Sequence, residues 1–267
     1  MSAAGLATLA RVAAIAREAG GEILEVYAAG AVASTAKADD SPLTAADLRA
    51  HQLIVRRLGE LTPELPVLSE EAADVPFAQR SRWRRYWLVD PLDGTREFLS
   101  RNGEFTVNIA LIEGHAPVLG VVHVPVTDTT YCGLAGAGAW RERAATAVQP
   151  IRVASRSATP LRVVGSRSHR GDSLAGFLAR VGPHELLAIG SSLKLCLVAE
   201  GAADVYPRLG PTSEWDTAAA HAVLLAAGGA VSALDGAPLE YNTRESLLNP
   251  FFVAYGPKDH DWLALLR

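Results

Sequence analysis

The chain has 267 residues, of which 49% are hydrophobic, so it can bury a large core and is not a disordered polypeptide. Its 25 Lys and Arg residues against 29 Asp and Glu residues give a net charge of −4, which provides no whole-molecule signal for nucleic-acid binding. No stretch has the apolar length of a membrane span or the pattern of a signal peptide. Two cysteines, Cys132 and Cys196, make no disulfide framework, and reduced thiols favour the cytoplasm.

The first predicted element is an amphipathic helix over residues 6–28, in which apolar side chains recur at steps of three and four. A polar stretch over residues 34–42 follows and predicts a loop. Thr44 has the character of an N-cap for a second helix, and Asp47 stands at the third helical position. On this local evidence, capping alone is the preferred interpretation of Asp47.

The centre of the sequence is an apolar strand over residues 87–89 that runs into the motif Asp90-Pro91-Leu92-Asp93-Gly94-Thr95. The proline is expected to end the strand, and a tight turn then brings Asp93 back beside Asp90, with the Leu92 carbonyl between them. Two carboxylates and a carbonyl oxygen are ligands that Mg²⁺ prefers. Gly94 and Thr95 add backbone N–H groups and a hydroxyl for a phosphate oxygen. An ordinary surface turn is the alternative, and the motif alone does not decide.

Three more strands are predicted at residues 104–112, 118–124 and 129–134. The polar segment 141–150 is the candidate boundary between an N-terminal α+β domain, residues 1–145, and a C-terminal α/β domain, residues 146–267. The second half alternates strands and helices, which predicts layered α/β packing. Its strands are expected at 161–165, 185–189, 203–206 and 251–255, and its helices at 174–181, 193–200, 215–227 and 259–266.

Two further carboxylates can reach the same point. Glu70 follows a short strand as Asp90 does, although adjacent glutamates are usually a solvated surface. Asp216 lies in the first turn of its helix, where the helix dipole alone explains an acid. Four converging carboxylates would repel one another, and two or more Mg²⁺ ions roughly 4 Å apart would relieve that repulsion and polarise a phosphate. Asp47 and Thr95 could then pass on the proton of an attacking water.

Three motifs in this order resemble the signature of the inositol monophosphatase superfamily. They are Ser69-Glu70-Glu71, Asp90-Pro91-Leu92-Asp93-Gly94-Thr95 and Trp215-Asp216-Thr217-Ala218-Ala219. The resemblance covers almost the whole chain. It implies a Mg²⁺-dependent, lithium-sensitive phosphomonoesterase with a layered αβαβα sandwich of the inositol monophosphatase and fructose-1,6-bisphosphatase type.

Four other segments look like one branch of this superfamily, the CysQ-type 3′(2′),5′-bisphosphate nucleotidases. They are residues 39–47, 101–110, 190–194 and 244–250. The branch removes the 3′-phosphate of adenosine 3′,5′-bisphosphate (PAP) to leave AMP, in sulfur assimilation, and activity on the related sulfated nucleotide (PAPS to APS) is left open. Two alternatives also stay open: an inositol-1-monophosphatase, and a non-catalytic member of the fold that contacts RNA or a polymerase.

The resemblance implies a function for each matching residue. Two or three Mg²⁺ ions would be held by Glu70, Asp90, Asp93, Asp216 and the carbonyl of Leu92. The catalytic residues that activate water would be Asp47, Thr95 and Glu70. The C-terminal half would bind the nucleotide, and the full set of substrate contacts would be Glu70, Leu92, Asp93, Gly94, Thr95, Ser191, Lys194, Arg208 and Asp216.

A bisphosphorylated nucleotide also needs cations for the phosphate that is not cleaved. Lys194 is the strongest candidate because it stands near the N-terminus of an otherwise apolar helix. The other candidates, each of which could be a solvated charge, are Arg208, Arg167, His169 and Arg170. Ala220 stands where the branch is expected to use Gly, which bears on packing. We expect a small-molecule nucleotide as the partner, with no nucleic acid and no transmembrane segment. The oligomeric state is left open between a monomer and a homodimer. A peripheral position on the inner membrane face is left open as well.

Overall fold

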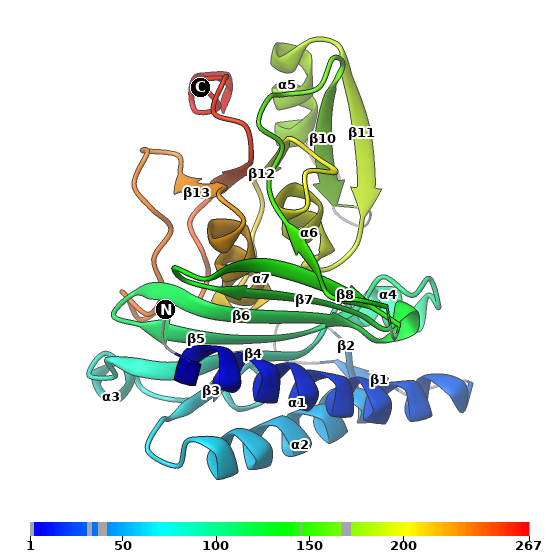
Figure 1. The fold of residues 1–267 in the computed structure, drawn as a ribbon, viewed down its shortest axis with the longest axis vertical. Helices are drawn as coiled ribbons and strands as arrows, with labels where there is room; N and C mark the ends of the chain where they lie inside the picture. Colours follow the sequence, from blue (N-terminus) through cyan, green and yellow to red (C-terminus); the bar gives the residue numbers. More distant parts are fainter. Residues whose placement is uncertain (1–2, 31–33, 37–41, 145, 167–171, 267) are drawn as a thin grey trace.

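The computed structural model describes residues 3–30, 34–36, 42–144, 146–166 and 172–266, and its helices and sheets alternate in layers (Figure 1). Helices α1 (Ala3–Ala28) and α2 (Ala45–Leu61) cover one face of a seven-stranded sheet. Helices α6 (Leu193–Ala199) and α7 (Glu214–Ala226) lie between this sheet and a five-stranded one, and α5 (Asp172–Val181) packs outside. The predicted αβαβα sandwich is confirmed.

The seven-stranded sheet follows the chain order from β3 to β9. Its first pair, β3 and β4, is parallel, and every later pair is antiparallel. The parallel pair places the carboxyl ends of β3 and β4 at one edge, which matters for the site below. The strands are β3 (Val67–Ser69), β4 (Arg85–Asp93), β5 (Thr106–Glu113), β6 (Ala116–Val124), β7 (Thr129–Leu134), β8 (Gly138–Arg143) and β9 (Gln149–Ile151).

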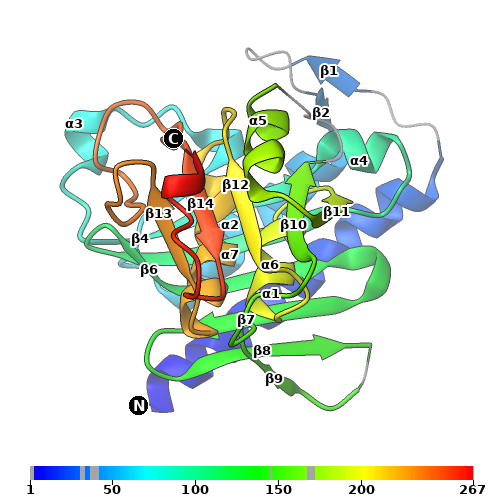
Figure 2. The same ribbon diagram turned by 90° about the horizontal axis from the view of Figure 1, so that it is seen from above.

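The five-stranded sheet has the order β11-β10-β12-β14-β13, and Figure 2 shows these strands side by side above the central helices. Strand β10 runs parallel to β11 and β12, whereas β14 is antiparallel to both of its neighbours. The strands are β10 (Leu161–Ser166), β11 (His184–Ile189), β12 (Val205–Arg208), β13 (Ala230–Ala233) and β14 (Phe252–Tyr255).

Helix α7 lies unusually close to the seven-stranded sheet because two strand positions are glycines. A Cβ at Gly120 would stand 2.1 Å from the carbonyl oxygen of Ala219, and a Cβ at Gly133 would stand 2.5 Å from the Cα of Val223. Close backbone approach of this kind is a common reason for a glycine inside a strand. Ala220 itself is fully buried in the core between the sheets. The packing fixes the helix that carries Asp216 against the sheet that carries Asp90 and Asp93.

Three sequence expectations about elements were wrong. The stretch 34–42 is not all loop: β1 (Ser34–Ala36) pairs antiparallel with β2 (Pro42–Thr44), while residues 37–41 lie outside the described residues. Pro91 does not end β4, because pairing with β5 is interrupted after Asp90 and resumes at Asp93. The expected helix at 259–266 is only a 3₁₀ turn, η3 (Ala264–Leu266).

The failure of the last helix has a local cause. The Asp261 carboxylate accepts a hydrogen bond from the backbone N–H of Ala264, the contact of a helix N-cap, so helical structure begins only after residue 261. The indole of Trp262 donates to the carbonyl of Pro257 and holds the segment against the outer core. Short elements were also missed: β9, β13, α3 (Phe77–Arg80), α4 (Thr95–Leu99) and the 3₁₀ turns η1 (Glu70–Ala72) and η2 (Pro125–Thr127).

The chain passes from the seven-stranded sheet to the five-stranded sheet between Ile151 and Leu161, because β9 still pairs with β8 in the first sheet. The expected boundary after residue 145 therefore precedes the end of the first sheet. The core between the sheets is shared, since it contains residues of both halves such as Leu88 and Phe252. The division into two domains stays a prediction.

Candidate active site

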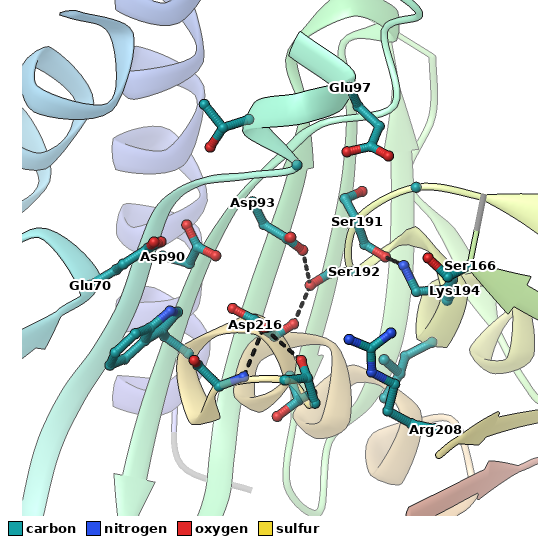
Figure 3. A pocket seen from close by; sticks show the side chains of 18 of the residues that line it. Glu70, Asp90, Asp93, Glu97, Ser166, Ser191, Ser192, Lys194, Arg208 and Asp216 are labelled. Carbon is teal, nitrogen blue, oxygen red and sulfur yellow. Dashed lines mark hydrogen bonds between the residues drawn. The ribbon is translucent and has the colours of Figure 1, made fainter. Parts of the chain in front are cut away.

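A pocket with a volume of about 510 Å³ lies where the ends of β4 and β12 meet the N-termini of α4, α6 and α7. Figure 3 shows Glu70 and Asp90 on one side, Lys194 and Arg208 on the other, and Asp93 and Asp216 between them. We call Glu70, Asp90, Asp93 and Asp216 the acidic wall, and Lys194 and Arg208 the basic wall. All six residues line this pocket, so the structure brings these metal and substrate candidates together.

Asp90 and Glu70 come from neighbouring parallel strands. Val89 of β4 is in register with Ser69 of β3, so the residues that follow, Asp90 and Glu70, lie side by side where β3 ends and β4 continues. Asp90 is 2% exposed, and its Oδ1 accepts from the N–H of Leu92 at 3.0 Å. Burial raises the pKa of Asp90 well above its ordinary value, and the nearby carboxylates of Glu70 and Asp93 raise it further.

Asp93 lies after the interruption in β4 and is held by two neighbours. Its Oδ2 accepts from Ser192 Oγ at 2.9 Å and from Asn108 Nδ2 at 3.3 Å. Burial and the carboxylate of Asp216 raise the pKa of Asp93 to about 6, although Lys194 and these two hydrogen bonds oppose the rise. The raised pKa means that burial destabilises the charged form of this carboxyl group, and a cation nearby would favour that form.

Asp216 is at the third position of α7, where it completes a capping box with Ser213. Its Oδ2 accepts from Ser213 N–H at 2.8 Å and from Thr212 Oγ1 at 2.6 Å. Burial raises the pKa of Asp216, and these hydrogen bonds oppose the rise. Both hydrogen bonds of the cap go to Oδ2 of Asp216, and the same side chain also lines the pocket. The capping and functional interpretations are therefore compatible.

Asp47 repeats this arrangement at the start of α2. Its Oδ2 accepts from the Thr44 N–H at 2.8 Å and from the Thr44 hydroxyl at 2.6 Å, which completes the predicted capping box. Its Oδ1 faces the site and accepts from Thr95 Oγ1 at 3.3 Å. The preference for capping alone was therefore too narrow. The Thr95 hydroxyl also lies 3.4 Å from the carbonyl oxygen of Leu92.

The donor set suits a hard divalent cation, because it consists of carboxylates and one carbonyl. The carboxylates are close enough to raise one another's pKa, an unfavourable arrangement that a cation would relieve. Among the described residues, however, no three His, Cys, Asp or Glu side chains are close enough to hold an ion by themselves. Mg²⁺ commonly binds through one or two carboxylates, with waters and substrate phosphates as its other ligands. A site in which fewer than three of these side chains hold one ion therefore fits Mg²⁺.

Gly94 links Asp93 to the short helix α4. Its φ of 92° lies in the left-handed region that glycine adopts at little cost. A Cβ there would stand 3.2 Å from the Glu104 carbonyl oxygen and 3.4 Å from Oε2 of Glu97. Gly94 and Thr95 thus start α4 at the floor of the pocket, where the sequence analysis expected contacts to a phosphate.

The basic wall comes from the other half of the chain. Lys194 is 8% exposed in the first turn of α6, and its Nζ donates to the carbonyl of Ser191 at 2.5 Å. Burial lowers the pKa of Lys194, and the nearby Asp93 carboxylate opposes that change. Ser191 has φ 47°, a strained value for a residue with a side chain. Arg208 at the end of β12 donates to the carbonyl of Pro211, and its Nε is buried without an acceptor in the described chain.

Some sequence candidates cannot be placed, and some site residues were missed. Arg167, His169 and Arg170 lie outside the described residues. Asn108 and Ser192 were within segments noted for their resemblance, but neither was singled out as a site residue. Glu97 also lines the pocket and is 7% exposed. The signal for Asn108 was a polar residue within an apolar strand, but the sequence does not show which face it occupies.

Known proteins resemble this chain over nearly its full length. Residues 6–264 match the model of the inositol monophosphatase family. The 3′(2′),5′-bisphosphate nucleotidase CysQ of Salmonella typhimurium is 54% identical over 91% of this chain and 98% of that protein. The protein of the same name from Escherichia coli K12 is 53% identical, with the same coverage.

Solved structures agree in fold. The crystal structure of CysQ from Bacteroides thetaiotaomicron, a member of the inositol monophosphatase family, has a TM-score of 0.82 and 42% identity, covering 94% of this chain and 97% of that one. An inositol monophosphatase from Anabaena has a TM-score of 0.76 and 25% identity, covering 98% and 95%. The chain therefore belongs to the inositol monophosphatase family.

Proposed function

We propose that this chain is a Mg²⁺-dependent 3′(2′),5′-bisphosphate nucleotidase that removes the 3′-phosphate of adenosine 3′,5′-bisphosphate and releases AMP and phosphate. The observation that carries the proposal is the presence of an acidic and a basic wall in one pocket of about 510 Å³. A phosphomonoesterase needs the first wall for cations, and a substrate with a second phosphate needs the other. Relatives that bear the name of this activity are 52–54% identical over 91% of the chain, which supports the substrate class.

The metal ligands in this proposal are the four carboxylates of the acidic wall and the carbonyl of Leu92, holding two or three Mg²⁺ ions. When bound, Mg²⁺ would polarise the phosphate, offset its charge and make water a better nucleophile. The chain's own contribution begins with the Thr95 hydroxyl, which donates to Asp47 and so presents a lone pair to an attacking water. Thr95 can take that water's proton as its own passes to Asp47. Glu70, at the same edge, is the third catalytic candidate.

The basic wall holds the phosphate that is not cleaved. Lys194 supplies a buried ammonium, and Arg208 supplies a buried Nε for which the described chain offers no acceptor. A buried donor without an acceptor is costly, and a phosphate oxygen would satisfy it. Ser191, in its strained conformation between the walls, adds a hydroxyl in the same pocket. This arrangement favours a bisphosphate over a monophosphorylated sugar alcohol.

Two alternatives are less well supported. An inositol-1-monophosphatase would use the acidic wall but has no need for the basic one. A non-catalytic RNA- or polymerase-binding protein would have no need for four carboxylates that raise one another's pKa. The sulfated nucleotide PAPS carries the same 3′-phosphate and is proposed as a second substrate. Sulfur assimilation is the proposed setting of the reaction, and lithium sensitivity is proposed as well.

A substrate panel tests this proposal. Phosphate release is measured from adenosine 3′,5′-bisphosphate, its 5′-phosphosulfate analogue, 3′-AMP and inositol 1-phosphate, with and without Mg²⁺ and Li⁺. We expect the bisphosphate to give the highest kcat/KM, with activity that requires Mg²⁺ and falls with Li⁺. A higher kcat/KM for inositol 1-phosphate would overturn the substrate assignment, and full activity in EDTA would overturn the metal assignment.

The proposed location is the cytoplasm, supported by two cysteines that are both free thiols in the structure. None of the described helices has the length and apolar character needed to cross a membrane. A monomer or homodimer, and a peripheral position on the inner membrane face, stay predictions.

A further inference from the structure

Four elements from both halves of the chain meet at the hydroxyl of Ser192. This residue precedes α6, and its Oγ lies 2.9 Å from Oδ2 of Asp93 on β4. It also lies 2.5 Å from the carbonyl oxygen of Asp216 on α7. The side chain of Asn108, on β5, completes the contact by donating from Nδ2 to Ser192 Oγ at 2.8 Å (Figure 3 shows Ser192 with Asp93 and Asp216).

The hydrogen-bond donors here are fully used. Asn108 Nδ2 has two protons, and it has two acceptors, Ser192 Oγ and Asp93 Oδ2. The single proton of Ser192 is within reach of Asp93 Oδ2 and of the Asp216 carbonyl. Asn108 is 1% exposed and Ser192 is 2% exposed, so water does not compete for these groups. Movement of the Asp93 carboxylate would break both of these contacts on Oδ2.

The arrangement leaves the other oxygen of Asp93 available. Within the described residues, both side-chain hydrogen bonds to this carboxylate go to Oδ2, so Oδ1 keeps its lone pairs for a further ligand. Loss of a group that orients a metal ligand in this way typically lowers metal affinity by about 10- to 100-fold. Ser192 also lies between Ser191 and Lys194, which line the substrate pocket.

We propose that Asn108 and Ser192 are a positioning pair: they fix the Asp93 carboxylate for a divalent cation and join the loop of the basic wall to the acidic wall. The inference rests on the proposed function only in requiring that a divalent cation binds at Asp93. It does not depend on which phosphate ester is the substrate.

Replacement of either residue should weaken metal binding more than it weakens the fold. Ser192→Ala removes one oxygen, and the Asp93 carboxylate is then restrained by Asn108 alone. We expect the apparent dissociation constant for Mg²⁺ to rise by about 10- to 100-fold, as for other residues that support metal ligands. Asn108→Ala should have a similar effect. Because the two residues act on one carboxylate, the double variant should be weaker by less than the product of the single effects.

The melting temperature of each variant is measured first in EDTA and then at increasing MgCl₂ concentrations. The value in EDTA reports fold stability, and its rise with MgCl₂ reports metal affinity. Ser192→Thr, which keeps the hydroxyl, should restore most of the affinity. Thr130→Val is the matched control, because it removes another buried hydroxyl, which is bonded to His123 on β6 away from the pocket. It should change the melting temperature without changing the Mg²⁺ dependence. In steady-state assays on the fastest substrate of the panel, the half-saturating Mg²⁺ concentration should rise while the substrate KM stays within about 3-fold.

The outcomes separate this inference from the proposed function. Unchanged Mg²⁺ affinity in both Ser192→Ala and Asn108→Ala would overturn the positioning pair, even if the bisphosphate is hydrolysed as proposed. A loss of affinity no larger than that of Thr130→Val, or multiplicative effects in the double variant, would also overturn it. If the native chain binds Mg²⁺ and loses affinity in the variants but does not hydrolyse the bisphosphate, the proposed function fails and the positioning pair stands.

Discussion

The acidic wall and the basic wall face one another across the pocket, but they are built from different kinds of structure. Asp90 lies within β4, Glu70 follows the adjacent parallel strand β3, and Asp216 is fixed by a capping box at the start of a helix packed tightly on the sheet. Lys194 stands in a helix of seven residues, and Arg208 ends a four-residue strand. Asp90, Asp93 and Asp216 thus belong to a nine-residue strand and a thirteen-residue helix, whereas both cations belong to shorter elements. Glu70 is the exception among the carboxylates, because it follows a three-residue strand.

This difference suggests a division of labour in the family. Carboxylates that position cations must be held in a fixed arrangement, which regular elements provide. The group that recognises the remainder of a substrate can differ between relatives without disturbing that arrangement, and short elements accommodate such change. We therefore expect substitutions in the acidic wall to affect every substrate and substitutions in the basic wall to affect one substrate class.

Asp93→Asn should have the largest effect. The change preserves shape but removes a negative charge from the proposed metal ligands, so we expect kcat/KM to fall by at least about 10³-fold, which corresponds to several kcal/mol of lost transition-state stabilisation. The loss should be similar for the bisphosphate and for 3′-AMP, measured as phosphate release at saturating Mg²⁺. A loss confined to one substrate would contradict the proposed division.

Thr95→Val should have the next largest effect. Valine has nearly the same shape as threonine but has no hydroxyl to donate to Asp47, so the proposed proton path is broken. We expect kcat to fall about 10²-fold, within the usual range for general acid–base groups, with a smaller change in KM. Thr95→Ser keeps the hydroxyl and should retain most of kcat. Equal rates for the valine and serine variants would remove Thr95 from the mechanism.

Lys194→Met should distinguish the role of the basic wall from that of the acidic wall, because it should affect one substrate and not the other. Loss of a charged hydrogen bond costs about 1.5–3 kcal/mol, so kcat/KM for the bisphosphate should fall about 10- to 100-fold. The value for 3′-AMP, which lacks the second phosphate, should change less than about 3-fold on the same reasoning. Lys258→Met, at an exposed position, is the matched control and should leave both substrates unaffected. Equal losses on both substrates would mean that Lys194 supports the acidic wall instead.

The same contrast explains how much the sequence could predict. Asp90, Asp93 and Glu70 could be singled out because each lies beside a strand end or an interruption in a strand, where local pattern determines geometry. Asn108 and Ser192 could not, because their importance comes from contacts between segments 84 residues apart. Asp47 shows an intermediate case: the capping role of Oδ2 is local and was predicted, while the contact of Oδ1 with Thr95 depends on the packing of α2 beside α4.

In the absence of a bound cation, the buried carboxylate of Asp93 should also make the stability of the fold depend on pH. Because the pKa of Asp93 is raised from 3.8 to about 6 in the fold, the folded chain binds its proton more tightly than the unfolded chain does. The free energy of unfolding should therefore fall as the pH rises through this interval, and Asp93→Asn should remove that loss. In EDTA this contribution should be small at pH 4. By pH 7.5 the stability of the native chain relative to Asp93→Asn should have fallen by about 2 kcal/mol, or roughly 4–8 °C in melting temperature. Asp74→Asn makes the same charge change at an exposed position, so its melting temperature relative to the native chain should not change with pH. Added MgCl₂ should raise the melting temperature of the native chain more than that of Asp93→Asn. A melting-temperature difference that stays constant from pH 4 to pH 7.5 would show that the Asp93 carboxylate is not destabilised by burial beside Asp216.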